Sequence, residues 1–245
     1  MIEVVVGAIA VGAFVKGVTG FGLPQIAIPV MAVFLGVEHA VVIMAIPGVV
    51  SNGWLVWSHR EMRRHTRDLP GMLGVGTVGA VVGTVLLKTL DGRVLSVILA
   101  SLILAYVLLT VFRSDVSLVP RITRFTSPPV GFLAGGLQGA TGISGPLLTT
   151  YLHAMRLPVR AYVLSLSVLF LVFSLVQTAT LVALGAFTDV LLAESLLALI
   201  PIMLLLPLGS RLRRHLSPTA FRWIVLILLT VTAIQLIHDA LTGAS

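Results

Sequence analysis

The sequence predicts an all-α integral membrane protein made of two inverted-topology repeats. Hydrophobic residues make up 58% of the 245-residue chain and charged residues only 10%, far from the balance of a soluble domain. Apolar runs of about 17–22 residues recur, each long enough to cross a hydrocarbon core of about 30 Å. A short phrase also occurs twice, as KGVTGFGLP at 16–24 and as QGATGISGP at 138–146.

Six uninterrupted spans and two interrupted segments follow from the hydropathy pattern. The spans are expected at 38–57, 70–87, 94–112, 161–184, 190–209 and 220–238. The interrupted segments cover 2–35 and 128–154, and each contains one copy of the repeated phrase. We interpret each as a hairpin of two short or half helices, hinged at 17–20 in the first copy and at 139–142 in the second.

The repeat divides the chain into 1–122 and 123–245, each a hairpin followed by three spans. An offset of 122 residues pairs Gly17, Thr19, Gly20 and Pro24 with Gly139, Thr141, Gly142 and Pro146. A glycine-rich composition explains part of this match on its own. The spans that follow each copy also align at about the same offset, which favours a true duplication.

Basic residues indicate how the two halves are oriented. Apart from Lys16, Lys88 and Arg93, every Lys and Arg lies in one of four segments: 58–69, 113–127, 155–160 and 210–222. Cytoplasmic loops carry such an excess of basic residues. With these segments in the cytoplasm, 128–154 starts and finishes on the same side, and each half makes an odd number of crossings. The second half is then inserted upside down, with both termini outside.

The two breaks combine residues that suit an anion. Non-helical backbone is tolerated at membrane depth only where it is buried in protein or lines a cavity, because lipid cannot bond its polar groups. A helix that restarts there presents free N–H groups, and its dipole favours negative charge. Pro24 and Pro146 suit a first helical turn, where no N–H is needed. Thr19, Thr141 and Ser144 add hydroxyls. The alternative is that the glycines only let helices pack closely.

Three further polar residues lie inside apolar segments. Lys16 is far from any segment end, and its repeat mate is Gln138. Ionisable groups at such depth are usually functional, although a lysine can also extend its long side chain to an interface. Asn52 lies within a span and either lines a site or bonds a neighbouring helix. Glu194 follows Asp189 near a span end, where we expect an interfacial position.

Several function classes are excluded or disfavoured by the sequence. The basic residues flank spans, which argues against nucleic-acid binding. No GxxxxGK[ST] or HExxH motif occurs, no histidine lies clearly at the level of Ser144, and cysteine is absent. We therefore expect neither an enzyme nor a bound metal or cofactor.

At these residues the chain resembles the sulfite exporter TauE/SafE family. The resemblance is carried by KGVTGFGLPQIAIPV and GGLQGATGISGPLLTTYL, with three spans after each, and it extends over essentially the whole chain. It implies a secondary carrier for small sulfur-containing anions, sulfite or a sulfonate, in a bacterial inner membrane. It is also compatible with a homodimer. The family residues matched here are Thr19, Gly20, Gly22, Pro24, Thr141, Gly142, Ser144, Gly145 and Pro146.

Together these observations predict an anion transporter, with an exporter favoured. The substrate is expected at the two facing breaks near the membrane midplane, bound by Lys16, Thr19, Gly20, Phe21, Gly22, Pro24, Asn52, Gln138, Thr141, Gly142, Ser144, Gly145 and Pro146. Broken helices also build selectivity filters, so the alternative is an anion channel or a membrane subunit without its own transport cycle.

Overall fold

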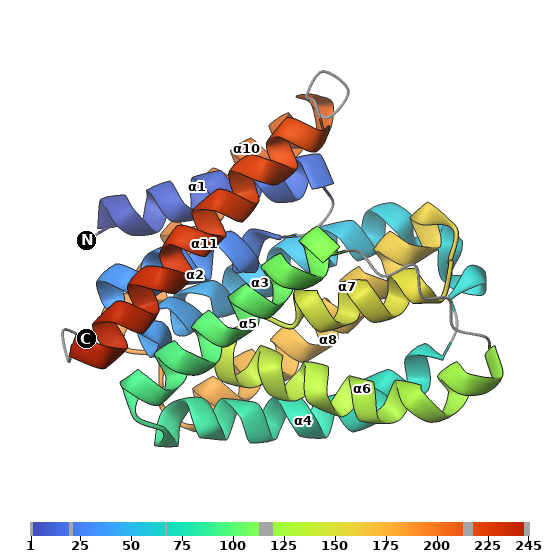
Figure 1. The fold of residues 1–245 in the computed structure, drawn as a ribbon, viewed down its shortest axis with the longest axis horizontal. Helices are drawn as coiled ribbons and strands as arrows, with labels where there is room; N and C mark the ends of the chain where they lie inside the picture. The colour runs from blue at the N-terminus through green and yellow to red at the C-terminus, as the bar shows by residue number, and fades with distance from the viewer. Residues whose placement is uncertain (1, 20–21, 67, 113–119, 213–217, 243–245) are drawn as a thin grey trace. The chain divides into compact units, whose positions relative to one another are not determined.

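The described elements of the chain are all helices. The computed structural model describes residues 2–19, 22–66, 68–112, 120–212 and 218–242. In chain order the elements are α1 Ile2–Thr19, α2 Leu23–Leu35, α3 Val37–His59, the 3-10 helix η1 Arg60–His65, α4 Leu69–Thr89, α5 Gly92–Phe112, α6 Pro120–Thr141, α7 Gly145–Ala154, α8 Val159–Ala183, α9 Asp189–Leu197, α10 Leu199–Leu212 and α11 Pro218–Thr242 (Figure 1).

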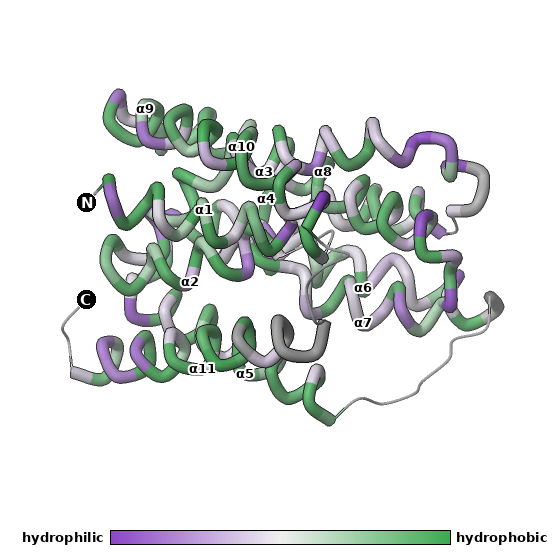
Figure 2. The backbone as a smooth tube through the Cα atoms, turned by 90° about the horizontal axis from the view of Figure 1, so that it is seen from above, coloured by the Kyte–Doolittle hydropathy of each residue, from purple (hydrophilic) through white to green (hydrophobic). Residues whose placement is uncertain are grey.

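Length and composition make this a multi-pass membrane protein. Within the described residues, seven helical segments are long and apolar enough to cross a membrane: 2–19, 37–63, 69–89, 92–112, 159–183, 189–212 and 225–242. Figure 2 shows apolar residues along most of each helix and hydrophilic residues at several helix ends. Each of the six expected spans overlaps one of these segments, and the first arm of the first hairpin is a seventh candidate.

The span expected at 190–209 is interrupted once. α9 ends at Leu197 and α10 begins at Leu199, with Ala198 between them. Pro201 explains the position of the interruption, because a proline has no N–H for the carbonyl four residues earlier and its ring collides with that carbonyl. The carbonyl concerned belongs to Leu197, the last residue of α9.

The second hairpin differs from the expectation of two short helices. Its first helix, α6, begins at Pro120 rather than near 128, and only α7 is short. Side-chain hydrogen bonds hold the additional turns. The Thr123 hydroxyl donates to Asp68 over 2.6 Å, and the Ser127 hydroxyl is 2.9 Å from that of Tyr151. The first hairpin also combines a longer first helix, α1, with a shorter second helix, α2.

The chain forms two compact units, and each draws on both halves of the sequence. Unit 1 comprises Met1–Pro47, Thr89–Arg113 and Phe187–Ser245, and unit 2 comprises Gly48–Lys88 and Ser114–Ala186. The boundary at Pro47 falls within α3. These units are not the halves 1–122 and 123–245, because compactness follows packing whereas the repeat describes chain order. The repeat stays a prediction.

Unit 1 contains the first hairpin. α1 packs along α10 and against α2, and α11 packs along α5 and against α2. Figure 1 shows α1 beside α10 and α5 beside α11. A Cβ added at Gly17 of α1 would overlap the carbonyl oxygen of Leu206, and one at Gly209 would overlap that of Phe14. Backbone therefore meets backbone where α1 crosses α10.

Unit 2 contains the second hairpin, packed against α4 and α8. α4 turns its small residues toward α6: a Cβ at Gly79 would overlap the carbonyl of Phe132, and one at Gly83 that of Gly136. The opposite face of α4 exposes Val78 and Val82, as expected beside lipid. Close backbone approach through small residues is how membrane helices gain packing contacts that the surrounding lipid cannot drive. Behind this pair lies a core of Leu69, Met72, Ala80, Ala134, Leu148, Tyr151, Leu152, Met155, Leu166, Leu169 and Phe173.

Candidate functional site

The first break separates α1 from α2. α1 ends at Thr19, and α2 restarts at Leu23 with Gly22 as its N-cap and Pro24 in its first turn. Gly22 has φ 103°, a conformation that a side chain would strain, and it provides no side-chain cap. Gly20 and Phe21, both predicted site residues, lie outside the described residues. The break thus leaves the start of α2 without side-chain capping.

The second break repeats this plan between α6 and α7. α6 ends at Thr141, Gly142 has φ 69°, and α7 restarts at Gly145 with Pro146 in its first turn. Ser144 is the N-cap, but its side chain makes no capping hydrogen bond. Both expected breaks, each with a proline just inside the new helix, are confirmed.

The expected hinges begin too early, although Gly142, the last residue of the second one, is non-helical. We placed them at 17–20 and 139–142, but Gly17, Thr19, Gly139 and Thr141 are all helical. A glycine in a helix is tolerated where another backbone must come close, and Gly139 contacts the backbone of Ala80 and Thr84 in α4. The non-helical residues of the second break are Gly142, Ile143 and Ser144.

Thr19 and Thr141, the last residues of α1 and α6, make the same kind of hydrogen bond. The hydroxyl of Thr19 donates to the carbonyl of Val15 over 2.9 Å, and that of Thr141 to Leu137 over 2.8 Å. The Thr141 oxygen also accepts the N–H of Ile143 at 3.3 Å. These hydroxyls therefore shape the breaks by bonding their own backbone, in addition to any part they take in binding.

Buried amides organise the second break. The Ser144 hydroxyl donates to Gln138 Oε1 over 2.9 Å, and Gln177 Nε2 of α8 donates to the carbonyls of Gln138 and Gly139 at 2.8 and 3.1 Å. All three side chains are buried. The last turn of α6 is thus fixed by a neighbouring helix.

The remaining predicted polar residues are also buried. Lys16 is only 2% exposed, in the last turn of α1, and Asn52 is 2% exposed in α3. Lys16 therefore shares a hairpin with Thr19, Gly22 and Pro24. The structure places the first break in unit 1 and the second break, with Asn52, in unit 2. That the two breaks face one another remains a prediction.

Glu194 is buried against a neighbouring helix, and its expected position at the membrane interface stays a prediction. It is 9% exposed, and its Oε2 lies 2.9 Å from Nε2 of His39 in α3. The neighbouring Ser195 donates to the carbonyl of Ile43 over 2.8 Å, so α9 is held to α3 by two adjacent residues. The sequence separation of 155 residues explains why no local pattern indicated the pair.

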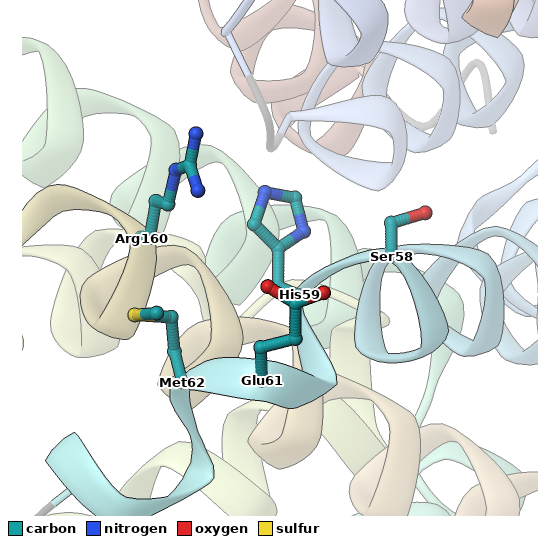
Figure 3. A pocket seen from close by; sticks show the side chains of 5 residues that line it. All are labelled: Ser58, His59, Glu61, Met62 and Arg160. Carbon is teal, nitrogen blue, oxygen red and sulfur yellow. The ribbon is translucent and has the colours of Figure 1, made fainter.

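A polar pocket of about 320 Å³ lies elsewhere in unit 2. Figure 3 shows the side chains that line it: Ser58, His59, Glu61, Met62 and Arg160. They come from the end of α3, from η1 and from the start of α8. None is a predicted site residue, and the pocket lies among the basic segments that the charge pattern assigns to the cytoplasm.

One family, described as Sulfite exporter TauE/SafE, matches residues 4–236. The chain belongs to the sulfite exporter TauE/SafE family. It is therefore a member of a family of membrane transporters, not of enzymes. Comparison with curated proteins and with solved structures found no match.

Family membership covers both hairpins and all six long spans that follow from the sequence. The matched range begins within α1 and ends within α11, so it includes both breaks. In this TauE/SafE chain the breaks are the features that differ most from simple spanning helices, and a membrane excludes such irregular backbone unless protein or a cavity surrounds it.

Proposed function

We propose that this TauE/SafE protein is a secondary carrier that exports small sulfur-containing oxyanions, sulfite or a sulfonate, and binds them at its helix breaks. One observation carries the proposal. Each break restarts a helix behind a glycine with positive φ and without a side-chain cap. N–H groups at such helix starts are ready donors, and the helix dipole adds positive potential there.

Lys16 supports a negatively charged substrate. Its side chain is 2% exposed and belongs to the last turn before the first break. A buried cation in a membrane protein is expensive and is usually kept for an ion or substrate. Family membership then favours sulfite or a related sulfur oxyanion among small anions.

The membrane potential provides a driving force for export. The sequence contains no nucleotide-binding GxxxxGK[ST] loop that would couple transport to ATP. With the cell interior negative, moving one negative charge outward is favourable by about 2.3 kcal/mol per 100 mV. A uniporter driven by this potential and by the anion gradient fits the residues.

Proton coupling is a second candidate because of one specific observation. Glu194 is buried against His39, and proton relays in transporters are built from Asp, Glu and His side chains. A proton-coupled carrier would respond to an imposed pH gradient at zero membrane potential. A uniporter would respond to the potential instead.

Flux measurements on purified protein in liposomes test the proposal. We expect saturable sulfite flux that an outside-positive potential accelerates outward and that sulfite on the opposite side stimulates by exchange. Flux that rises linearly with concentration, without exchange, would identify a channel. Absence of flux for sulfite, sulfate, thiosulfate and methanesulfonate alike would overturn the proposed function.

A further inference from the structure

Gln25 is a buried donor whose side-chain nitrogen has no protein partner in the described part of the chain. It is the third residue of α2, and its side chain is 7% exposed. Its Nε2 is fully buried, and the described residues offer this atom no hydrogen bond. A buried amide that stays unbonded costs free energy, so native proteins usually pair such groups or use them to bind something.

The amide of Gln25 lies at the first break. A Cβ added at Gly22 would lie 3.6 Å from Gln25 Oε1 and 3.6 Å from Cγ1 of Val15. The carboxamide therefore sits beside the N-cap of its own helix, next to the last turns of α1. That N-cap has no side-chain hydrogen bond. Within the described residues, the amide with the unpartnered nitrogen and the helix start without a side-chain cap are therefore at one place in unit 1.

The second break differs at the corresponding positions. Leu147 occupies the place of Gln25, and Ser144 occupies the place of Gly22. There the Ser144 hydroxyl donates to Gln138 Oε1, so this serine already has a protein partner. At the first break the corresponding residues are Lys16, Gly22 and Gln25. Gly22 lacks the hydroxyl that Ser144 provides. Lys16 and Gln25 instead add an amine and an amide donor.

We propose that Gln25 Nε2 donates a hydrogen bond to an oxygen of the transported oxyanion, which makes the start of α2 the selective part of the binding site. This inference depends on the proposed function. An ammonium group, a primary amide and helix N–H groups are all donors, and a sulfite or sulfonate group offers three oxygens to accept from them. Gln25 is thus a substrate-binding residue that the repeat alone does not identify, because its mate is apolar.

Substitution of Gln25 by methionine tests the assignment. Gln25→Met keeps the length and approximate shape of the side chain and removes the donor. A bond to a charged ligand is lost, so sulfite affinity should fall about tenfold or more. The melting temperature without sulfite should stay the same or rise, because an unbonded buried amide disappears. Affinity is measured by sulfite titration of the purified protein, and stability by thermal unfolding.

Gln177→Met is the matched control. Gln177 is also a buried glutamine, but its Nε2 donates to two carbonyls of α6. Its replacement should lower the melting temperature without sulfite, the opposite sign to Gln25→Met. The two variants together separate a ligand-binding amide from a structural one.

A second variant keeps the test decisive if Gln25→Met does not fold. Gln25→Glu preserves the shape and brings negative charge to the same place, so it should abolish sulfite binding. Wild-type sulfite affinity in either folded variant overturns the role of Gln25 and leaves the proposed function intact. If the wild-type protein binds neither sulfite, sulfate nor methanesulfonate, the proposed function itself fails, and this inference fails with it.

Discussion

Lys16 and Gln138 occupy the same repeat position but belong to different local environments. Gln138 Oε1 accepts from Ser144, and the backbone carbonyl of Gln138 accepts from Gln177. Lys16 is also buried, and its side chain ends in an amino group. If both breaks bind anion, the first provides most of the charge and the second mainly backbone N–H groups.

This difference gives a prediction for Lys16. Lys16→Gln, which copies the mate residue, should weaken sulfite binding roughly tenfold or more, since a charge-assisted hydrogen bond contributes about 1.5–3 kcal/mol. Lys16→Arg should keep part of the affinity. Lys88→Gln is the control, because Lys88 is an exposed lysine at the end of α4. Equal sulfite affinity for Lys16→Gln and wild type, by titration of purified protein, would mean that Lys16 has no part in binding.

At the scale of elements, Gly139 and Gly142 have different structural roles although they are only three residues apart. Gly139 lies where α6 meets α4, and a Cβ there would overlap the carbonyl of Ala80. Gly142 lies outside the helix, with φ 69°. The packing explanation of the glycine-rich breaks therefore holds for Gly139 and for Gly17, whereas Gly142 and Gly22 are required by the turn itself.

Alanine at these two positions should separate packing from turn geometry. Gly139→Ala forces α4 and α6 apart, so we expect poor assembly in size-exclusion chromatography. Gly142→Ala places a side chain in the left-handed region at a cost of about 1–2 kcal/mol, which a membrane protein can tolerate while its helix start moves. It should fold but lose most sulfite transport. Transport by Gly142→Ala at the wild-type rate would argue against binding at the break.

Ser144→Ala belongs to the same comparison and should be mild. The serine hydroxyl is bonded to Gln138, so its loss removes one neutral hydrogen bond of about 0.5–1.5 kcal/mol. A backbone-dominated site predicts reduced affinity without loss of transport. Complete loss of transport in a folded Ser144→Ala protein would instead assign the main binding role to the hydroxyl.

For the whole molecule, the hairpins pack in a reciprocal way. The first hairpin packs on α10 through Gly17, and the second packs on α4 through Gly139. α10 comes from the second half of the sequence and α4 from the first, so each hairpin contacts the second span of the opposite half. This reciprocal packing indicates two similar halves, and their inverted orientation stays a prediction.

Membrane topology is the measurable consequence. Single cysteines at Met62 and Pro120 should be labelled from the cytoplasmic side, and those at Leu90, Phe187 and Gly243 from the outside. The chain has no native cysteine, so each label reports one position. Cytoplasmic labelling at both Pro120 and Phe187 would contradict the inverted arrangement. Arg93, the one arginine outside the four basic segments, makes Leu90 the most demanding of these tests.

The sequence by itself determined the class of protein, the spans and the existence of two breaks. These properties depend on local quantities: the transfer free energy of a 20-residue segment, the missing N–H of Pro24 and Pro146, and the distribution of arginine. A pattern of this kind needs no knowledge of neighbours. The sequence also located Lys16, because an ionisable residue within an apolar segment can be recognised from the sequence alone.

Only the tertiary structure decided at which residues the helices end beside each break and which side chains hold these helix ends in place. The helices extend through Thr19 and Thr141, whose hydroxyls bond carbonyls of the preceding turn. The burial of Glu194 against His39 and the bond from Gln177 to α6 join residues far apart in sequence, and the unbonded amide of Gln25 is visible only once its surroundings are known. Such contacts are set by how helices pack, and packing depends on shape complementarity between distant segments, which no local pattern contains.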